Sequence, residues 1–498
     1  MNCKVNFRQL RAFSTGKSLA AQDVFILAAA RTPMGSFRSS LGPLSATQLG
    51  AAAIKEALSR AKVSPNKVDD VYMGNVCPAG LGQAPARQAA LFAGLPTSSE
   101  ATTINKVCAS GLKAISVGAQ TILLGENDIV VAGGMESMSN VPFYLRRADP
   151  AYGGAQLQDG IVLDGLTDVY NKIHMGNCAE NTVKKVGITR AEQDQYAVNS
   201  YKKSASAYSS GRIAAELVPI EVPAKKGSKI EVHEDEEYKK INFDKFKSLR
   251  PAFLKENGTI TAGNSSTLND GGAALVLASE TAAKEFGTPI ARIIGAVDVA
   301  TDPIDFPLAP ALGIPKLLAK YNLRVDDISH WEINEAFSAV VLAAIKKLHL
   351  DPSKVNPNGG AVSLGHPIGM SGARLVVHLA HALKKGEKGV ASICNGGGGS
   401  TSLLIEKIED EFKGPVLKLY TKYPCPLCDV LKEELRLNYN HRFSALQEVN
   451  IEAGENEKYF DLYKYEIPVL FMNGVFVCKN KLDHVKLDQM FKEVERKK

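Results

Sequence analysis

Three side chains that could carry out acyl transfer lie beside glycine-rich stretches of the sequence. Cys108 lies in NKVCASG, His366 in GHPIG and Cys394 in CNGGGGS. A thiol can act as a nucleophile, and an imidazole can take its proton. Backbone N–H groups that glycines leave accessible can stabilise an oxyanion. A lone buried cysteine is usually inert packing, but three such groups in glycine-marked turns predict acyl transfer combined with carbanion chemistry.

Long stretches around these residues resemble the thiolase family between about Asp23 and Ile408. The matching stretches are NKVCASGLKAIS, VAGGMESMS, NEAF, NGGAVSLGHPIGMSGAR and CNGGGGS. The chain is most similar to the mitochondrial branch of that family, which acts on acetoacetyl-CoA. This resemblance implies an α/β protein with the thiolase fold, in which two similar halves of αβαβα type carry an inserted loop domain. It also implies a homotetramer.

The resemblance assigns a role to each residue of the predicted catalytic centre. It makes Cys108 the nucleophile that carries an acyl thioester, His366 its activating base and Cys394 the acid/base for the methyl group of acetyl-CoA. His366 with a water on Asn334 would bind one oxyanion, and the backbone N–H groups of Cys108 and Gly396 the other. The reaction implied is the reversible conversion of two acetyl-CoA molecules into acetoacetyl-CoA and CoA. Because Cys108 precedes a predicted helix, we also expect the helix N-terminus to lower its pKa.

Further positions match the ligand sites of the family. The candidates for binding coenzyme A are His174, Met175, Tyr201, Lys240, Asn242, Lys245, Ser266 and Phe337. The oxygen ligands implied for a potassium ion belong to Tyr201, Ala262, Gly263, Ser265 and Val362. Backbone carbonyls and a phenol oxygen are suitable hard ligands for such a cation. The pair Phe306-Pro307 also resembles the acetoacetyl-CoA branch, and it predicts that 2-methylacetoacetyl-CoA is cleaved as well.

Three other functions stay open at this point. A degradative long-chain 3-ketoacyl-CoA thiolase would use the same catalytic residues, although Phe306-Pro307 and the potassium residues argue against it. A β-ketoacyl synthase shares the fold but would carry histidine or asparagine at position 394. A non-catalytic scaffold that binds coenzyme A and serves a redox domain would not need an intact set of catalytic residues.

The composition argues against several classes of protein. The 498 residues carry a formal net charge of +6 with both signs interspersed, whereas a nucleic-acid surface would show a clustered basic stripe. No apolar run reaches the roughly 18 residues that a membrane span needs. Eight cysteines are too few for a disulfide scaffold in so long a chain, so we expect reactive thiols in a reducing compartment. The mild excess of Lys and Arg suits an anionic ligand such as coenzyme A.

The first 22 residues are typical of a mitochondrial transit peptide. They contain Lys4, Arg8, Arg11 and Lys17 among small and hydroxyl residues, and they contain no Asp or Glu. They predict a protein of the mitochondrial matrix. The rest of the chain divides into a thiolase N-terminal half at 23–290 with a loop domain at about 144–253, a C-terminal half at 291–408, a linker at 409–415 and a second domain at 416–498.

Strands alternate with helices in both halves, which predicts a parallel or mixed sheet covered on both faces. Ser45 is expected to cap a helix that ends near Ala61, and Thr189 with Glu192 to form a capping box for the one helix predicted in the loop domain. Further strands are predicted at Val24–Ala29, Val71–Val76, Ala101–Asn105, Ile129–Ala132, Ala273–Ala278, Ile293–Ala296, Trp331–Asn334, Gly359–Ser363, Gly389–Cys394 and Ser402–Ile408. Further helices are predicted at Gly111–Leu124, Ala311–Tyr321, Ser338–Leu348 and Ser371–Leu383.

Residues 416–498 resemble a glutaredoxin-like domain with a small thioredoxin-like α/β fold. Cys425 and Cys428 form a CxxC motif at the start of a predicted helix, and Ile467-Pro468 matches the cis-proline that faces such a motif. Zinc would need two more ligands, and only Cys478 and His484 are offered, so no zinc is expected. Glu466 and the lack of a Gly-Gly pair depart from glutaredoxins, so a catalytically idle domain remains open.

Overall fold

The computed structural model describes residues 23–147, 152–224, 227–408, 415–439, 442, 443 and 445–496. The chain divides into two compact units, Met1–Ile408 and Glu409–Lys498. The predicted transit peptide, residues 1–22, and residues 409–414 of the predicted linker lie outside the described residues. Within the described residues, no helix has the length and apolar character that crossing a membrane requires.

A mixed ten-stranded sheet is the framework of the first unit, and its order is β14-β15-β16-β13-β1-β12-β5-β3-β4, with β2 beside β12. The strands are β1 (Val24–Arg31), β2 (Gly35–Ser36), β3 (Asp70–Gly74), β4 (Glu100–Ile104), β5 (Ile129–Ser137), β12 (Asn269–Ser279), β13 (Ala291–Ala300), β14 (His330–Ile333), β15 (Lys388–Asn395) and β16 (Gly399–Lys407). β1 pairs with β13 over a short stretch only, from Val24 to Ile26. The sheet therefore joins two groups of strands, one from each half of the sequence.

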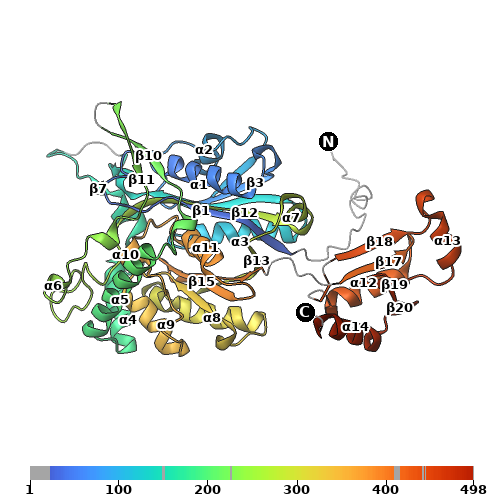
Figure 1. Cartoon of the computed structure of the whole chain (residues 1–498). Coiled ribbons are helices and arrows are strands. Elements are labelled where there is room, and N and C mark those ends of the chain that lie inside the picture. Colours follow the sequence, from blue (N-terminus) through green and yellow to red (C-terminus); the bar gives the residue numbers. More distant parts are fainter. Residues whose placement is uncertain are drawn as a thin grey trace, which may run out of the picture. The chain divides into compact units, whose positions relative to one another are not determined.

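Helices cover the outer faces of both groups of strands and also lie between them (Figure 1). The outer helices are α1 (Ala46–Ala61) and α2 (Pro85–Phe92) on one side, and α8 (Ala309–Lys320) and α9 (Ser338–Leu348) on the other. The inner helices are α3 (Ser110–Leu123) and α11 (Ser371–Ala382), and a short helix α7 (Glu280–Phe286) follows β12. The arrangement gives the five αβαβα layers that the sequence predicts, and Ser45 caps α1 as predicted, in a capping box with Gln48.

The two inner helices approach each other closely enough to need glycine at the contact. A Cβ on Gly111 would lie 2.9 Å from backbone atoms of Gly369 and Ala373, and a Cβ on Gly372 would lie 2.5 Å from the backbone nitrogen of Leu112. Such contacts exclude any larger residue unless the helices move apart. The turns that precede the two helices, which carry Cys108 and His366, are therefore held side by side although they come from different halves.

The loop domain contains two helices of appreciable length where the sequence predicts one. α5 (Arg190–Ser209) begins at the predicted capping box. α4 (Met175–Val186) has no counterpart in the prediction because its N-cap is His174, whose Nδ1 accepts a hydrogen bond from the Gly176 N–H at 3.1 Å. Histidine is not among the usual capping residues. The remaining elements are β6 (Phe143–Tyr144), β7 (Gln158–Asp159), β8 (Thr167–Asp168), β9 (Ile173–His174), β10 (Ile220–Pro223), β11 (Lys229–Val232) and α6 (Phe243–Phe246).

The strand predicted at Gly359–Ser363 is wrong, because the segment forms the short helix α10 (Ala361–Leu364). Its backbone groups are satisfied within the segment and by the side chain of a distant residue rather than by a neighbouring strand. The Leu364 N–H donates to the Gly360 carbonyl at 2.8 Å, and the Val362 N–H donates to the buried Glu335 carboxylate at 3.0 Å. The other predicted strands and helices of this unit are present with small shifts at their ends.

The second unit has a four-stranded sheet in the order β18-β17-β19-β20. Its elements are β17 (Val416–Thr421), α12 (Pro426–Tyr439), β18 (Ala445–Asn450), α13 (Glu457–Tyr463), β19 (Val469–Met472), β20 (Val475–Lys479) and α14 (His484–Arg496). β17 runs parallel to β18 and antiparallel to β19, and β19 and β20 form a hairpin. The predicted cis peptide bond between Ile467 and Pro468 is confirmed.

Candidate active site

Cys108 lies in a tight turn between β4 and α3. The preceding residue, Val107, has a φ of 49°, which is unusual for a β-branched residue. Two hydrogen bonds hold the turn in this conformation: the Val107 N–H donates to Asn105 Oδ1 at 3.0 Å, and the Lys106 N–H donates to Ser110 Oγ at 2.8 Å. The strained turn presents the thiol at the N-terminus of α3, where the sequence places it.

The expected low pKa of Cys108 is wrong. Burial raises the pKa of this thiol to about 12, and the distant Glu136 carboxylate adds to the effect. The backbone N–H groups of Gly396 and of Cys108 itself oppose it by stabilising the thiolate, but they do not outweigh burial. Only 9% of Cys108 is exposed, so the water that would solvate a thiolate is excluded. The nucleophile is a neutral thiol at rest.

His366 is neutral as well, and its hydrogen bonds define which nitrogen carries the proton. Burial, with a smaller contribution from Arg374, lowers its pKa to about 3. The Ser371 hydroxyl donates to the Pro367 carbonyl at 2.8 Å, so it can only accept from His366 Nδ1, which lies 2.5 Å away. Nδ1 therefore holds the proton and Nε2 keeps a lone pair. Nε2 faces Asn334 Nδ2 at 3.4 Å.

Asn334 follows β14 and is completely buried. Its backbone N–H donates to the Ser392 carbonyl at 3.0 Å, which fixes it beside β15. Its side-chain Oδ1 has no hydrogen-bond partner among the described residues. A buried amide oxygen without a partner is costly, and it belongs to the same amide whose Nδ2 faces His366 Nε2. It can accept a hydrogen bond from a water molecule or a substrate.

Cys394 and Gly396 lie where β15 turns into β16. The turn needs glycine, because Gly397 and Gly398 have φ values of 85° and 88° and a Cβ on Gly398 would lie 2.2 Å from the Thr301 carbonyl oxygen. Cys394 is fully buried, and burial together with the neighbouring Cys108 raises its pKa well above the ordinary value. The turn thus brings a second neutral thiol and an accessible N–H group to Cys108.

The structure brings the predicted catalytic residues into two neighbouring groups. Cys108, Cys394 and the Gly396 N–H form one group, and His366 with Asn334 forms the other. No hydrogen bond between Cys108 and His366 is present within the described residues. The His366 backbone N–H donates to Asn269 Oδ1 at 2.9 Å, which places its turn against β12.

Apolar and aromatic residues surround the two thiols. Met175, Phe306, Phe337 and Cys394 belong to one buried cluster. Phe253 packs against the edge of Phe337 at 6.2 Å and stacks on His174 at 4.8 Å between ring centroids. The predicted residues His174, Met175 and Phe337 are thus brought together along one apolar wall. Phe253 belongs to this wall and is not among the predicted residues.

The other residues predicted to bind coenzyme A are more dispersed. Ser266 Oγ donates to the Ala336 carbonyl at 2.9 Å, so it lies beside Phe337. Lys240 is about half exposed and hydrogen-bonds Ser36, and Lys245 is exposed. Asn242 caps α6 by accepting from the N–H groups of Asp244 and Lys245. The two lysines are available for an anionic ligand, whereas the Asn242 side chain already has partners.

The residues predicted to hold potassium gather around Phe246. Tyr201 and Val362 share one buried cluster with it. A Cβ on Gly263 would lie 2.8 Å from the Phe246 ring, so the loop of Gly263 packs closely against this cluster. Burial raises the pKa of Tyr201, and the negative charges of Glu237 and Glu335 raise it further. A phenol oxygen in such a negative field fits a bound cation, and Ala262 and Ser265 flank Gly263 and Asn264 in the same loop.

Two domain families match the first unit: "Thiolase, N-terminal domain" at residues 24–281 and "Thiolase, C-terminal domain" at residues 287–407. The chain is 58% identical over 399 residues to a mitochondrial acetyl-CoA acetyltransferase of Xenopus laevis, and the match covers 80% of this chain and 94% of the relative. The chain belongs to the thiolase family. The family and fold that the sequence predicts are confirmed, which excludes a β-ketoacyl synthase.

Other proteins that are similar to this chain are also thiolases or acetyl-CoA acetyltransferases. The mitochondrial acetyl-CoA acetyltransferase of Homo sapiens is 57% identical over 388 residues, which are 78% of this chain and 91% of the relative. A crystal structure of the Acat5 thiolase from Ascaris suum in complex with coenzyme A matches with 49% identity and a TM-score of 0.75, covering 78% of this chain and all of that one. "Glutaredoxin-like domain" matches residues 416–492.

Glu136 is a residue of the thiolase site that the sequence analysis misses. It is fully buried at the end of β5 and accepts hydrogen bonds from the N–H groups of Val76 and Gly369 at 2.9 Å and of Cys77 at 3.2 Å. Burial raises its pKa to about 7. The carboxylate ties the turn after β3 to the turn of His366. An acidic residue at the end of an otherwise apolar strand was the signal for it.

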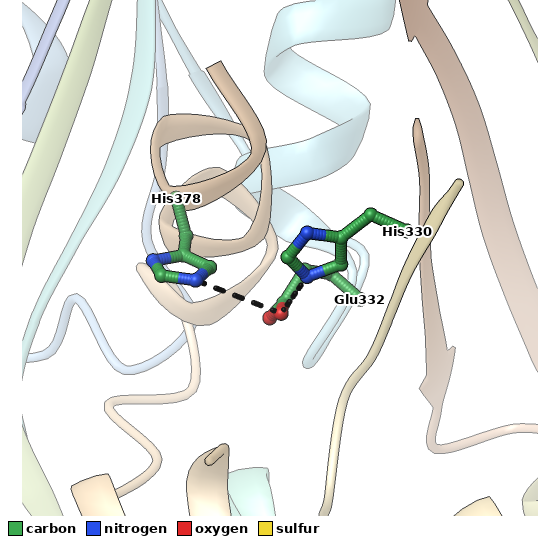
Figure 2. A group of neighbouring side chains, drawn as sticks. All are labelled: His330, Glu332 and His378. Atoms are coloured by element: carbon green, nitrogen blue, oxygen red, sulfur yellow. Dashed lines mark hydrogen bonds and ion pairs between the residues drawn. The ribbon is translucent and has the colours of Figure 1, made fainter. Parts of the chain in front are cut away.

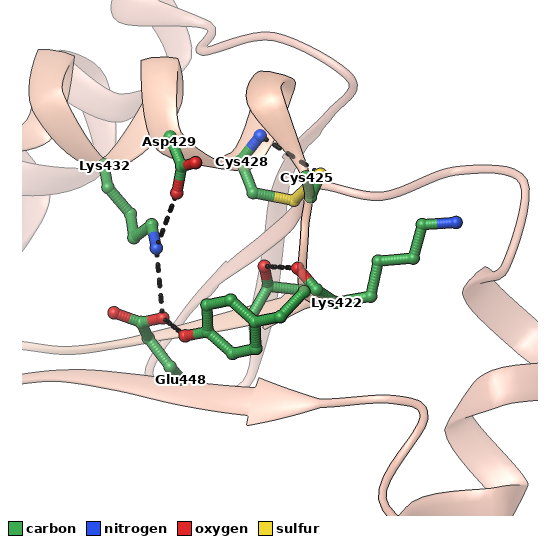
Figure 3. The surroundings of a disulfide bond; sticks show 8 residues. Lys422, Cys425, Cys428, Asp429, Lys432 and Glu448 are labelled. Atoms are coloured by element: carbon green, nitrogen blue, oxygen red, sulfur yellow. Dashed lines mark hydrogen bonds and ion pairs between the residues drawn. A yellow bond between two sulfur atoms is a disulfide. The ribbon is translucent and has the colours of Figure 1, made fainter. Parts of the chain in front are cut away.

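In the second unit, Cys425 and Cys428 form a disulfide at the start of α12 (Figure 3). Both residues are buried, and the Cys428 N–H points to Cys425 Sγ at 3.3 Å. Lys432 on the same helix bridges Asp429 at 3.0 Å and Glu448 at 3.4 Å. Cys478 is also buried, and the nitrogen Nδ1 of His484 hydrogen-bonds the Tyr439 hydroxyl at 3.0 Å.

Proposed function

We propose that this thiolase is an acetyl-CoA C-acetyltransferase that converts two acetyl-CoA molecules reversibly into acetoacetyl-CoA and CoA. The observation that carries the proposal is the convergence of two buried thiols, Cys108 and Cys394, with the neutral His366 beside an unpaired Asn334 oxygen. A scaffold that only binds coenzyme A would have no use for this set. Relatives of 57–58% identity that are named acetyl-CoA acetyltransferases support the choice within the family.

In the first step, the Cys108 sulfur attacks the thioester carbonyl carbon of acetyl-CoA, and CoA leaves as a thiol. Because thiol and imidazole are both neutral at rest, the proton moves to His366 Nε2 as the bond forms rather than beforehand. The carbonyl oxygen becomes an oxyanion near the N–H groups of Cys108 and Gly396. Each such donor is worth about 3–4 kcal/mol in comparable sites. The acetyl group then remains on Cys108 as a thioester.

In the second step, the Cys394 thiol passes its proton to His366 Nε2, and the thiolate then takes a proton from the methyl group of another acetyl-CoA. The resulting enolate oxygen is stabilised by the protonated His366 Nε2 and by a water held on Asn334 Oδ1, and the enolate carbon attacks the acetyl group on Cys108. The bond between the carbonyl carbon and the Cys108 sulfur breaks, Cys108 takes the proton back from His366, and acetoacetyl-CoA is released. The unpaired Oδ1 supports the assignment of that water, because a buried acceptor gains most from a donor of this kind.

The size of the acyl group is set by the wall around the thiols. Phe306 is buried in the same cluster as Cys394 and Phe337. Its ring limits the space beyond the reacting carbon, which favours short acyl groups and a single methyl branch over a long chain. We therefore include 2-methylacetoacetyl-CoA among the substrates and set aside the degradative long-chain 3-ketoacyl-CoA thiolase.

Potassium is part of the proposal because the predicted residues fit it. The Tyr201 oxygen and the backbone carbonyls of Ala262, Gly263, Ser265 and Val362 would hold the ion. When bound, it would supply positive charge that orders the loop beside Ser266 and Phe337. Val362 is also tied to Glu335, the residue after Asn334, so the ion site and the catalytic centre share a support.

The cellular setting follows from the relatives and from the N-terminal residues. The relatives are named as mitochondrial proteins, and the first 22 residues have the composition of a transit peptide. We place the protein in the mitochondrial matrix. A homotetramer is the assembly implied by the resemblance, and the mass of the purified protein in solution tests it.

The glutaredoxin-like domain supplies a second function, thiol–disulfide exchange. The observation that favours it is that Cys425 and Cys428 form a disulfide at a helix N-terminus, in one buried cluster with Ile467. Cys425 would be the attacking thiol and Cys428 the resolving thiol. The assay is reduction of the domain followed by reaction with a disulfide substrate. A domain that stays oxidised against common dithiols, or that shows no exchange, is catalytically idle.

Turnover with acetoacetyl-CoA and CoA tests the principal proposal. We expect acetyl-CoA to form at a rate that depends on protein concentration and vanishes in Cys108→Ser. Long-chain 3-ketoacyl-CoA should react far more slowly than acetoacetyl-CoA. Absence of turnover with any 3-ketoacyl-CoA would leave the scaffold as the remaining function.

A further inference from the structure

A buried polar seam runs from His366 between α11 and β14. Residues on β14 alternate between two faces: Trp331 and Ile333 enter the apolar cluster under α8 and α9, while His330, Glu332 and the following Asn334 face α11. On α11 the facing residues are Ser371, Arg374 and His378, which recur at helical spacing. All six of these polar residues are buried.

The contacts along this seam follow one register. At one end, Ser371 holds His366, and His366 faces Asn334. In the middle, Arg374 pairs with Glu332 Oε2 at 2.7 Å. At the other end, Glu332 Oε1 lies 2.9 Å from His330 Nε2 and 3.9 Å from His378 Nε2, as Figure 2 shows. A shift of the strand along the helix would break the middle contact and change the separation of His366 and Asn334.

The network continues beyond the seam through His378. His378 Nδ1 also pairs with Glu216 at 2.7 Å, and Glu216 pairs with Arg31, which pairs with Asp235. Three carboxylates thus face two guanidinium groups. Burial alone would lower the pKa of His378, but Glu216 and Glu332 outweigh burial and raise it.

The donor atoms of His330, Glu332 and His378 lie within 4.8 Å of one another, which a metal ion could bridge. Two observations argue against an ion here. The carboxylate of Glu332 already has Arg374 as its cation, and the Asn358 amide lies 3.0 Å from His378 Nε2, on the side that an ion would need. The cluster is better explained as a link between the strand and the helix.

We propose that Glu332 is a positioning residue for the catalytic reaction: by holding Arg374 and facing His378 it fixes the register of β14 against α11, and thereby the pairing of Asn334 with His366. Glu332 touches no substrate and acts through these two residues. The inference rests on the proposed function, because it concerns the site to which that function assigns the enolate.

The test compares Glu332→Gln with Asp235→Asn. Both carboxylates are completely buried and paired with an arginine, but among the described residues Asp235 forms no hydrogen bond or ion pair with α11 or β14. We expect Glu332→Gln to lower kcat for thiolysis about 10- to 100-fold with KM for acetoacetyl-CoA within about two-fold of the parent. Both variants should lower the melting temperature by a similar amount, but Asp235→Asn should keep kcat within about two-fold of the parent.

A double variant, Glu332→Gln with Arg374→Met, separates positioning from stability. It leaves no unpaired charge, so the melting temperature should recover while kcat stays low. Recovery of kcat together with the melting temperature would overturn the proposal, and so would an equal loss of kcat in Asp235→Asn. If Glu332→Gln alone does not fold, the double variant decides by the same criteria.

A structural readout keeps this inference separate from the proposed function. In crystal structures of parent and double variant, the distance from His366 Nε2 to Asn334 Nδ2, 3.4 Å here, should change in the variant. An unchanged distance overturns the positioning role whether or not the parent turns over acetoacetyl-CoA. Absence of turnover in the parent overturns the proposed function alone.

Discussion

Replacing Ser371 by alanine should impair the catalytic base without touching the substrate. The Ser371 hydroxyl accepts a hydrogen bond from the proton-bearing Nδ1 of His366 at 2.5 Å. By holding the proton on Nδ1, Ser371 keeps the lone pair of Nε2 free to act as the base. In Ser371→Ala the buried Nδ1–H loses its acceptor, at a cost of about 1–3 kcal/mol. The ring can avoid this cost by moving the proton to Nε2, which removes the base. Since each 1.4 kcal/mol is a factor of ten, kcat should fall roughly 5- to 150-fold.

The assay measures kcat for thiolysis and the rate of acetyl transfer to Cys108, because His366 serves both steps. Ser371→Thr retains a hydroxyl and should keep most of the activity. Ser402→Ala is the matched control, because Ser402 is an equally buried serine whose hydroxyl lies 2.8 Å from Ser392 Oγ rather than beside His366. Ser371→Ala and Ser402→Ala with equal kcat would refute the assignment of the tautomer.

Five further outcomes follow from the site and from the second unit. Alkylation of Cys108 in the free enzyme should accelerate about tenfold per pH unit with no plateau near pH 8.5, because burial raises its pKa to about 12 and the reactive thiolate grows with pH up to that value; a plateau near neutral pH would show that a thiolate is present at rest. Cys394→Ala should still accept an acetyl group on Cys108 but fail to exchange the methyl protons of acetyl-CoA with solvent, and exchange at the parent rate would remove Cys394 from its role. Replacing potassium by sodium should weaken acetoacetyl-CoA turnover, whereas indifference to the swap would argue against the ion. Truncation after Ile408 should leave thiolysis nearly intact because the assigned residues precede it, and loss of thiolysis would contradict this expectation. After reduction, Cys425 should react with an alkylating agent at mildly acidic pH ahead of Cys428. Equal, slow labelling of both cysteines would contradict that order.

The sequence predicts the fold well where apolar patterns and caps are regular. The strands that form the sheet, the capping boxes at Ser45 and Thr189 and the helix after Cys108 all follow from local signals. Two elements of the structure differ from the prediction. α4 begins at a histidine cap that propensity does not mark, and Val362 resembles a strand residue although its N–H is claimed by Glu335 from a distant part of the chain.

In the candidate site, too, some properties follow from local sequence and others depend on contacts across the whole fold. Motifs locate the catalytic residues because each lies in its own glycine-marked turn. They do not show protonation, since the pKa of Cys108 depends on how much water the complete fold excludes. Nor do they assign a role to Glu136, although it lies within VAGGMESMS, or to Phe253, because each of these residues acquires its role only through contacts with segments far away in the sequence.

The two cysteines of the site differ in surroundings, and the difference assigns their roles. Both thiols are neutral because both are buried, but two N–H groups, from Gly396 and from Cys108 itself, favour the thiolate of Cys108. Cys394 has only its own N–H, and burial together with the neighbouring Cys108 raises its pKa. The additional N–H group therefore favours Cys108 as the site of acylation. Once Cys108 carries an acetyl group it has no proton left to give, and Cys394 is the thiol of this group that can pass its proton to His366 and then act as the base.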